Sequence, residues 1–338
     1  MLNQIHEITY SPLSMRQKIT ASLKGERCLV HNENNESAEL MLKLEDSSLL
    51  VFVEINTALN DDLILVGLEY LIAHNRGLKN FKVTGLDRLT NESSILKKYF
   101  SNANEVQFTR TDFFQLNVLW HVKRDFVYDV ERFMVTDGRE HPIRAQKLKG
   151  KLYSRYVPEI GKTISFRMMD LDKDIDVFVE WQNQKRVAKF WEMAESKESL
   201  LKFANMRLNE DPHTLPMILE WDDEAAGYFE MYWTREDRLG PYYESSAYDR
   251  GFHFLIGNSK FLGGKNTDAT LQSMIHFLFL DDKRTRKVMA EPRADNTLVL
   301  RYMTSFPVFK KLFEFDFPHK RAAMIECTKE RFIMGDYL

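Results

Sequence analysis

The order of hydrophobic and polar positions is clearest in the second half of the chain. Residues 163–169 ("TISFRMM") alternate as a β-strand does, and the two stretches that follow, 174–194 and 196–209, have helical patterns. Two apolar runs, 216–221 and 227–233, flank the turn residues "DDEAA" and predict a β-hairpin. This half of the chain therefore begins as a strand, a helical layer and a hairpin.

The pattern continues with a strand at 251–257 ("GFHFLIG") and a helix after it. That helix is marked by apolar residues at i, i+3, i+4 and i+7: Leu271, Met274, Ile275 and Leu278. Strands are expected at 287–292, 308–317 and 321–327, with a short helix at 296–303. A helical connection between two strands favours a parallel pair, whereas hairpins favour antiparallel pairs. We expect an α/β domain with a mixed central sheet flanked by helices.

An α/β pattern also occupies the first half of the chain. We expect strands at 49–55 and 105–122 and helices at 61–77 and 91–100. The polar, basic stretch 137–156 contains Gly and Pro and separates the two patterns. The predicted domains are therefore an N-terminal α/β domain, 1–140, and a second domain, 150–338, with the dense chemistry in the second.

Composition narrows the class of protein. A chain of 338 residues with 44% hydrophobic residues is long enough for about two globular domains. The net charge of −3 and pI near 6.3 argue against nucleic acid or an anionic membrane as partner. Two cysteines suit a reducing compartment, and the N-terminus has no apolar leader, so we expect a cytoplasmic protein.

The stretch "LIGNSKFLGGKNTDATL" (255–271) is a candidate phosphate-binding loop. A P-loop would need glycine and a hydroxyl residue where Ser259 and Asn266 stand, so that motif is excluded. Glycines still let main-chain N–H groups approach a phosphate, and the helix that starts near Thr267 adds its positive end. A plain strand-to-helix turn with solvated lysines stays open as the alternative.

Several ordered blocks resemble one enzyme family. They are "SFRMMD", "WQNQKRVAKFWEMA", "YFEMYWTREDRLGPYY", "YDRGFHFLIGN", "HFLFLDDKRTRKVMAEPRADN" and "EFDFPHKRAAM". Block by block they are similar to the N-acyltransferases of hydroxamate siderophore biosynthesis, above all to the aerobactin-type hydroxylysine N-acetyltransferases of the GCN5-related N-acetyltransferase (GNAT) superfamily. The resemblance covers about residues 150–325, and the N-terminal part is only faintly similar, as a degenerate acetyltransferase-like domain would be.

This resemblance implies a function. A GNAT fold would transfer an acetyl group from acetyl-CoA to the hydroxylamine nitrogen of an N-hydroxylated lysine or diamine, by direct attack in a ternary complex. Two alternatives stay open: succinyl-CoA-dependent acylation of N-hydroxyputrescine or N-hydroxycadaverine, and a non-catalytic acyl-CoA-binding module. No metal site is implied, because no zinc-type Cys/His spacing occurs. Whether the chain forms a homo-oligomer is left open.

The resemblance also marks residues that would hold the coenzyme. The coenzyme would be bound by main-chain groups of the strand after His253, by the loop and by the start of the following helix. The residues implied are Leu255, Ile256, Lys260, Gly263, Gly264, Lys265, Asn266 and Thr267, together with Asn296 further along the chain. Many acetyltransferases of this superfamily protonate the thiolate with a tyrosine. The corresponding position holds Met303, and Tyr302 is one residue, about 100° of helix, away.

His253 is the main catalytic candidate. The family places a histidine on this strand, where alternation puts His253, Leu255 and Gly257 on one face. An N-alkylhydroxylamine is largely neutral near pH 7, so the histidine would only accept a proton as the tetrahedral intermediate forms. A structural histidine is the alternative.

Two acids follow the neighbouring strand. Ligands collect beyond the carboxyl ends of parallel strands, so Asp295, in the first place, and Glu291, in the second, are expected to orient His253 or hold the acceptor. The alternative for Asp295 is that it caps the helix beginning at Asn296.

The acceptor's distal ammonium needs a partner. Glu192 and Glu230 lie among aromatic residues, including Trp191, and would suit an ammonium through charge and cation–π contact. The alternative is that the aromatic residues form core and both acids point outward.

Overall fold

The computed structural model describes residues 7–15, 17–45, 48–54, 61–85, 95–102, 105–122 and 130–338. The chain forms two compact units. The first comprises residues 1–123, 154–162 and 338, and the second comprises 124–153 and 163–337.

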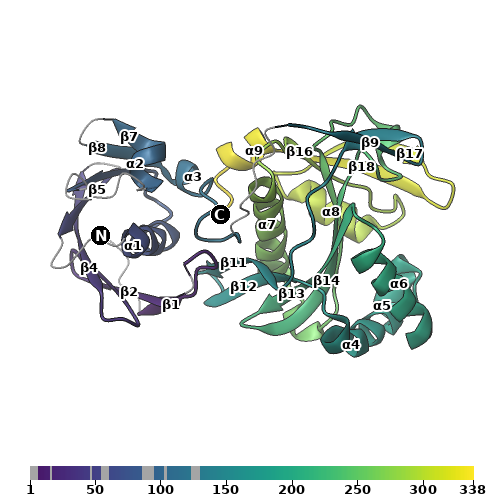
Figure 1. The fold of residues 1–338 in the computed structure, drawn as a ribbon, viewed down its shortest axis with the longest axis horizontal. Coiled ribbons are helices and arrows are strands. Elements are labelled where there is room, and N and C mark those ends of the chain that lie inside the picture. Colours follow the sequence, from purple (N-terminus) through teal and green to yellow (C-terminus); the bar gives the residue numbers. More distant parts are fainter. Residues whose placement is uncertain are drawn as a thin grey trace. The chain divides into compact units, whose positions relative to one another are not determined.

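The first unit is a sheet wrapped on a buried helix (Figure 1). Its elements are β1 (Ile8–Tyr10), β2 (Ile19–Lys24), β3 (Arg27–Asn32), β4 (Ser37–Glu45), β5 (Ser48–Glu54), α1 (Asp61–His74), β6 (Asn80–Thr84), α2 (Ile95–Phe100), β7 (Ser101–Asn102), β8 (Glu105–Thr109) and α3 (Arg110–Phe113). The strand order is β1-β2-β3-β4-β5-β6-β8-β7, with β5 and β6 parallel and the other described pairs antiparallel. Helix α1, buried from Leu63 to His74, packs on β2, β3 and β4.

The predictions for this unit were partly right. The strand at 49–55 and the helices at 61–77 and 91–100 are present as β5, α1 and α2, although residues 55 and 91–94 lie outside the described part. The strand predicted at 105–122 is wrong beyond Thr109. A capping box ends it: the Thr109 side chain accepts from the N–H of Asp112 (3.1 Å), and the Asp112 carboxylate accepts from the N–H of Thr109 (2.8 Å).

The second unit holds a larger set of elements. They are β9 (Phe133–Thr136), β10 (Arg139–Pro142), β11 (Lys151–Val157), β12 (Lys162–Met168), α4 (Leu171–Asn183), α5 (Lys185–Trp191), α6 (Lys197–Asn209), β13 (Thr214–Trp221), β14 (Glu224–Trp233), β15 (Arg250–Ile256), α7 (Gly264–Asp281), β16 (Lys287–Ala290), α8 (Thr297–Ser305), β17 (Lys310–Asp316), β18 (Arg321–Thr328) and α9 (Lys329–Met334). The main sheet runs β11-β12-β13-β14-β15-β16-β18-β17, and the last four residues of β11 and the first of β12 are counted with the first unit.

The predicted order of elements is confirmed from β12 to β18, except that the helical stretch predicted at 174–194 is divided at Gln184 into α4 and α5. The hairpin β13–β14 turns at Asp222 and Asp223, whose φ angles of 49° and 63° match a tight hairpin turn. The two faces of the sheet are covered by different helices (Figure 1). Tyr228 faces the cluster built on α4, α5 and α6, whereas Phe229 and Phe166 face α7. The mixed α/β sheet flanked by helices is therefore as expected.

The two units share one strand order. In each, five strands are followed by a helix, a sixth strand parallel to the fifth, a second helix and two closing antiparallel strands, with a short helix after the last strand. The difference lies between the second and third strands of each sheet. In the first unit β2 and β3 are joined by Gly25 and Glu26, and in the second unit α4, α5 and α6 lie between β12 and β13.

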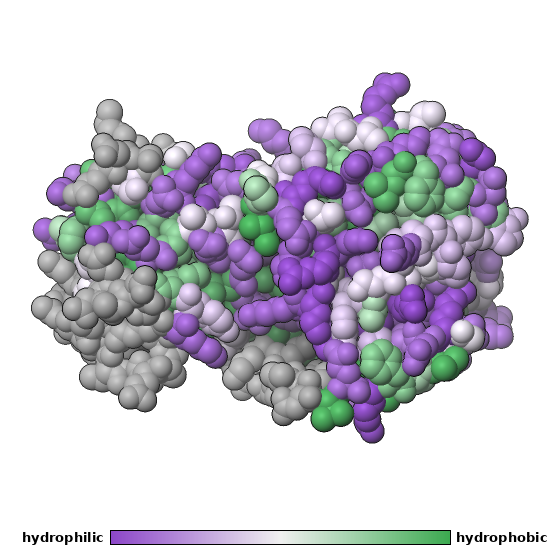
Figure 2. Space-filling model, turned by 90° about the horizontal axis from the view of Figure 1, so that it is seen from above, coloured by the Kyte–Doolittle hydropathy of each residue, from purple (hydrophilic) through white to green (hydrophobic). Residues whose placement is uncertain are grey.

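The face of the molecule drawn in Figure 2 is mostly polar. Figure 2 shows hydrophilic side chains over much of one face, interrupted by separate hydrophobic groups. Among the described residues no helix is both long and apolar enough to cross a membrane.

Candidate active site

The parallel pair β15–β16 opens at one end. Strand β15 pairs with β14 along its whole length, from Arg250 to Ile256, but with β16 only at Arg250 and Gly251. From Phe252 onward the β15 edge that faces β16 has no strand partner in this fully described part of the chain. An open edge between diverging parallel strands is where α/β sheets bind ligands.

The glycine loop lies directly after this open edge and starts a helix. Gly264 is the first residue of α7, and Gly263 before it has a φ of 138°, a conformation that residues with side chains rarely adopt. The Thr267 N–H and hydroxyl both hold the Gly263 carbonyl (2.9 Å each). Asn266 donates to the Phe261 carbonyl (3.3 Å), and Lys260 pairs with Glu224 on the surface. The first main-chain N–H groups of a helix have no partner within the helix, and α7 is 18 residues long, so its start can bind an anion.

Helices α4 and α5 fix the end of β15. A Cβ on Gly257 would meet the Trp181 ring at 2.0 Å, so only glycine allows this close approach. Arg186 donates to the carbonyls of Ile256 and Gly257, both at 2.6 Å. Leu255 and Ile256 are buried, which leaves their main-chain groups as the part that can meet a coenzyme.

His253 lies between two glutamates. Its Nε2 is 2.6 Å from Glu291 Oε1, and its Nδ1 is 3.2 Å from Glu230 Oε2. Glu230 stands directly opposite His253 across the β14–β15 pair, and Glu291 follows the last residue of β16. The His253 side chain is 25% exposed, while Glu230 and Glu291 are buried at 5% and 0%. Three neighbouring strands thus bring one imidazole and two carboxylates together.

Further donors surround the two carboxylates. Glu291 accepts from the Tyr232 hydroxyl (2.7 Å), and Glu230 accepts from the Tyr228 hydroxyl and from Arg207 Nε (3.2 Å each). Tyr232 and Trp191 also contact the His253 ring, with centroids 4.9 and 6.3 Å away.

The three groups strongly change one another's protonation. Burial opposes the charged imidazole, but the charge of Glu291 and the hydrogen bonds to both glutamates raise the pKa of His253 to about 9. Burial alone would favour neutral Glu291, yet the charge and hydrogen bond of His253 lower its pKa to about 2. Against the same effect of burial, His253 and Arg207 lower the pKa of Glu230. The cluster therefore carries a cationic histidine between two carboxylates.

Asp295 does not contact His253, and the predicted order of the two acids is corrected. Its side chain is 68% exposed and pairs with Arg293 (3.0 Å). The chain leaves β16 at Glu291 and then runs beside β18, where Ala294 donates to the Arg321 carbonyl, so Asp295 is carried away from the imidazole. Glu291, the second choice, is the partner.

The remaining predicted residues have other contacts. The cap of α8 is Asn296, which accepts from the Val299 N–H (3.3 Å), rather than Asp295. Glu192 is 60% exposed and pairs with Arg293. Tyr302 donates to Asp268 near the start of α7, and Met303 is buried. A substrate role for Glu192 and a coenzyme role for Asn296 remain predictions.

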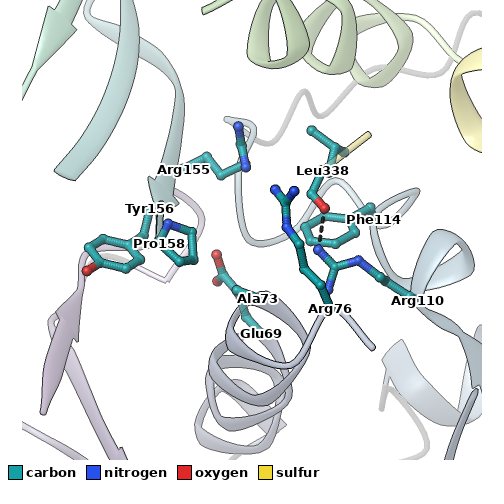
Figure 3. A pocket seen from close by; sticks show the side chains of 9 residues that line it. All are labelled: Glu69, Ala73, Arg76, Arg110, Phe114, Arg155, Tyr156, Pro158 and Leu338. Atoms are coloured by element: carbon teal, nitrogen blue, oxygen red, sulfur yellow. Dashed lines mark hydrogen bonds between the residues drawn. The ribbon is translucent and has the colours of Figure 1, made fainter. Parts of the chain in front are cut away.

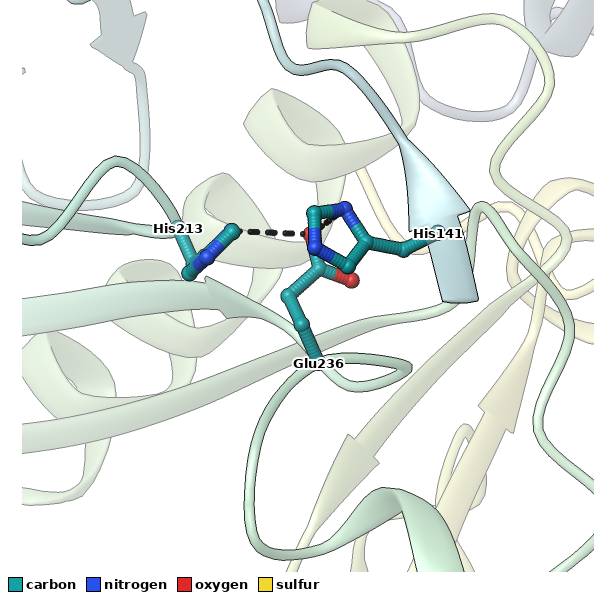
Figure 4. A group of neighbouring side chains, drawn as sticks. All are labelled: His141, His213 and Glu236. Atoms are coloured by element: carbon teal, nitrogen blue, oxygen red, sulfur yellow. Dashed lines mark hydrogen bonds and ion pairs between the residues drawn. The ribbon is translucent and has the colours of Figure 1, made fainter. Parts of the chain in front are cut away.

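A second cluster has the residue types of a metal site. His141, His213 and Glu236 have ligand atoms within 4.8 Å of one another (Figure 4). Both oxygens of Glu236 are already bound by Arg144, which also stacks on Trp233 at 4.1 Å. A fixed guanidinium supplies the positive charge that a metal would bring, so these residues form a buried ion-pair network.

A small pocket lies in the first unit. Figure 3 shows Glu69 and three arginines around it. Arg76 pairs with Glu159 (2.7 Å), and Arg110 donates to the carbonyls of Ile72 and Leu338. Trp120 Nε1 donates to Glu69 (2.7 Å), whose pKa burial raises to about 7.

Glu69→Gln is expected to stabilise the first unit at high pH. The folded pKa of Glu69 lies above its ordinary value of 4.5, so wild-type stability falls as the pH rises from 4.5 through 7. Glutamine removes this cost, and the gain should reach about 3 kcal/mol at pH 8 and vanish near pH 4.5. Hydrogen exchange of α1 amides at both pH values measures it, with the more exposed Glu159→Gln as control. If the α1 amides of wild type and of Glu69→Gln were equally protected at both pH values, the raised pKa of Glu69 would be contradicted.

Gly263→Val is expected to raise the KM for acyl-CoA by about 10-fold and change the acceptor KM little. A Cβ there meets nothing within 4 Å, so the effect comes from a φ of 138° that valine cannot hold. Gly138→Val, at another open position with positive φ, is the matched control. An unchanged acyl-CoA KM in the folded Gly263 variant would remove the loop from the site.

The domain model "Acetyltransferase (GNAT) domain" matches residues 170–317. These residues contain α4 to β17, and so the open edge, the glycine loop and the glutamate–histidine cluster. A crystal structure of an uncharacterised Bacillus halodurans protein is 24% identical, with a TM-score of 0.52, and covers 56% of this chain and 96% of its own; it shows the fold alone.

Relatives with assigned names are similar over more of the chain. A Schizosaccharomyces pombe protein named for lysine N-acyltransferase activity is 35% identical over 240 residues, 71% of each chain. The N(6)-hydroxylysine O-acetyltransferase of Escherichia coli is 34% identical over 62% of this chain and 64% of its own. The N(5)-hydroxyornithine:cis-anhydromevalonyl coenzyme A-N(5)-transacylase of Beauveria bassiana is 39% identical over 57% of this chain, which spans 43% of that relative. With its open strand edge and helix-start loop in place, the chain belongs to the GNAT-domain acyltransferase family that includes these relatives, and it is an acyl-CoA-dependent acyltransferase.

Proposed function

We propose that the protein transfers an acyl group, in the first place acetyl, from acyl-CoA to the hydroxylamine nitrogen of an N-hydroxylated lysine, ornithine or diamine, giving a hydroxamate for siderophore assembly. The observation that carries this proposal is the Glu230–His253–Glu291 cluster beside the open edge of β15. The names of the hydroxylysine and hydroxyornithine relatives support the acceptor class.

The open edge of β15 and the start of α7 suit the coenzyme. The main chain of Leu255 and Ile256 would bind the pantetheine arm, and Gly263, Gly264 and Lys265 would bind its pyrophosphate through main-chain N–H groups and charge. The acyl carbon would then stand near His253, where the acceptor attacks it directly.

Opposite charges near His253 suit an amino-acid acceptor. Burial and the charge of Glu291 raise the pKa of Asp237, so a substrate ammonium there would relieve a repulsion. Lys320, which donates to the Glu291 carbonyl (2.8 Å), supplies a cation for a carboxylate. These groups favour hydroxylysine or hydroxyornithine over a hydroxylated diamine.

A panel assay tests the proposal. Acetyl-CoA and succinyl-CoA are each combined with N6-hydroxylysine, N5-hydroxyornithine, N-hydroxyputrescine and unmodified lysine. We expect thiol release and ferric-hydroxamate colour with acetyl-CoA and a hydroxylated amino acid, and little with lysine. Absence of thiol release with every acceptor would instead indicate an acyl-CoA-binding module, and preference for succinyl-CoA with hydroxyputrescine would reassign donor and acceptor.

A further inference from the structure

The hydrogen-bond partners of His253 restrict the form of its ring. An ionised carboxylate only accepts hydrogen bonds, and a neutral imidazole carries a proton on one nitrogen. Both nitrogens of His253 face carboxylate oxygens, at 2.6 and 3.2 Å. A neutral ring would therefore turn a lone pair toward one of the two glutamates. Only the imidazolium donates to both.

Both glutamates are held in the ionised form by further donors. The Tyr232 hydroxyl donates to Glu291, while the Tyr228 hydroxyl and Arg207 donate to Glu230. Hydrogen bonds to the charged form of a carboxyl favour that form. The second negative partner of the ring is therefore a carboxylate rather than a neutral acid, and the proton stays on the histidine.

The other charged groups near the cluster do not cancel this preference. Asp237, in the segment after β14, favours the imidazolium through its charge interaction with His253, while burial and the charge of Glu291 raise the pKa of Asp237 itself. Lys320, between β17 and β18, and Arg207, on α6, are the opposing cations. Lys320 donates to the main-chain carbonyl of Glu291 and Arg207 donates to the carboxylate of Glu230, so neither binds the ring. The sum of these effects keeps the pKa of His253 at about 9.

We infer that His253 works as a proton donor and that Glu230 is the proton acceptor of the same reaction, with Glu291 as the positioning residue that holds the ring. This inference deepens the proposed function and rests on it. It replaces the role of proton acceptor that the sequence suggests for His253. The longer contact, to Glu230, is the one that can open when the two substrates enter.

In this reaction one proton passes from the acceptor nitrogen to the departing thiolate by way of Glu230 and His253. The hydroxylamine nitrogen bonds to the thioester carbon with its lone pair, and the carbonyl π electrons move to oxygen. The nitrogen, now cationic and far more acidic than a free hydroxylammonium, gives its proton to Glu230. The carbonyl re-forms, the carbon–sulfur bond breaks, and the thiolate takes the Nδ1 proton of His253. The proton on Glu230 then returns to Nδ1, which leaves hydroxamate and free coenzyme A.

The pH dependence of kcat separates a histidine donor from a histidine acceptor. A donor predicts kcat nearly constant from pH 6.5 to 8 and falling about tenfold per pH unit above 9, as His253 loses its proton. An acceptor predicts the opposite: kcat rises with pH until the ring has lost its proton, near pH 9, and stays high to pH 10. Glu291→Gln should move the falling limb at least one pH unit lower, whereas Asp295→Asn, an exposed acid four residues away, should leave it in place.

Nitrogen NMR of histidine-labelled enzyme without substrates reads the ring directly, with His253→Ala used to assign its signal. We expect an imidazolium at pH 7.5 that titrates near 9 in the wild type. A neutral ring at pH 7.5, or a kcat that rises from pH 6 to 8 without a later fall, would overturn the inference while hydroxamate formation stands. An imidazolium together with no acyl transfer to any hydroxylated acceptor would instead overturn the proposed function, and the catalytic role of His253 with it.

Discussion

Replacing His253 by alanine should lower kcat by about 10²–10⁴, the range for loss of a positioned acid or base, and leave the acyl-CoA KM nearly unchanged. The substitution removes the proton donor and leaves Glu230 and Glu291 as two buried acids with no cation between them. Activity should not disappear, because a hydroxylamine nucleophile is already neutral near pH 7. Steady-state kinetics with a hydroxylated acceptor, at fixed pH, measure the effect.

His319→Ala is the matched control for that experiment. His319 is exposed and stacks on Phe317 at 5.4 Å, and it makes no hydrogen bond to Glu230 or Glu291. Its substitution should change kcat less than twofold, as surface substitutions usually do. A folded His253→Ala enzyme with near-full kcat at neutral pH would show that His253 is a structural residue.

Glu291→Gln should lower kcat by about 10²-fold, whereas Asp295→Asn should have little effect. The amide keeps the shape of the side chain but removes the charge that holds the His253 proton. The double variant with His253→Ala should lose less than the two single losses combined, because the residues act as a unit. Full additivity, or an Asp295→Asn loss as large as that of Glu291→Gln, would contradict the assignment.

The Glu291–His253 ion pair also makes the stability of the protein depend on pH. The pKa of Glu291 is lowered, so its contribution is present above its ordinary value of 4.5 and is lost as the pH falls toward 2. The pKa of His253 is raised, so its contribution is complete below 6.5 and is lost as the pH rises through 9. The stability difference between wild type and Glu291→Gln should therefore be largest between pH 4.5 and 6.5.

Local patterns predicted most of the second unit. Strand alternation placed His253 and Leu255 on one face, and Leu255 indeed packs in the cluster under α4 to α6. The rule about the carboxyl ends of parallel strands also located the right segment, since Glu291 follows β16 directly. The choice between Glu291 and Asp295 depended on where the chain turns toward β18, which no local pattern contains.

Residues from distant elements could not be predicted. Arg207 reaches Glu230 from α6, and Arg186 reaches the end of β15 from α5. Long cations on helices have the same pattern whether solvated or bound, so the sequence carries no signal for them. For Tyr232 the sequence did carry a signal, because Tyr232 shares a strand face with Glu230, two residues away.

The strands of the first unit were harder to predict from the sequence, for a different reason. Strand β2 buries Ile19, Ala21 and Leu23, and the neighbouring β3 buries Cys28 and Val30, so both alternate as strands do. Several positions of these two six-residue strands hold small or polar residues, which weakens the contrast in hydrophobicity between their buried and exposed positions. Long-range pairing, rather than strong local preference, forms these strands.

The repeated strand order poses a folding hazard. Each unit must close a parallel pair across a helix, β5 with β6 and β15 with β16, and such non-local closures are slow. During synthesis, strands of one unit could add to the unfinished sheet of the other, a typical failure of repeated domains. The three helices between β12 and β13 work against this exchange, because a two-residue turn joins β2 to β3 in the first unit. Helices that cover the His253 face of one sheet can in this way also keep two similar sheets from mispairing.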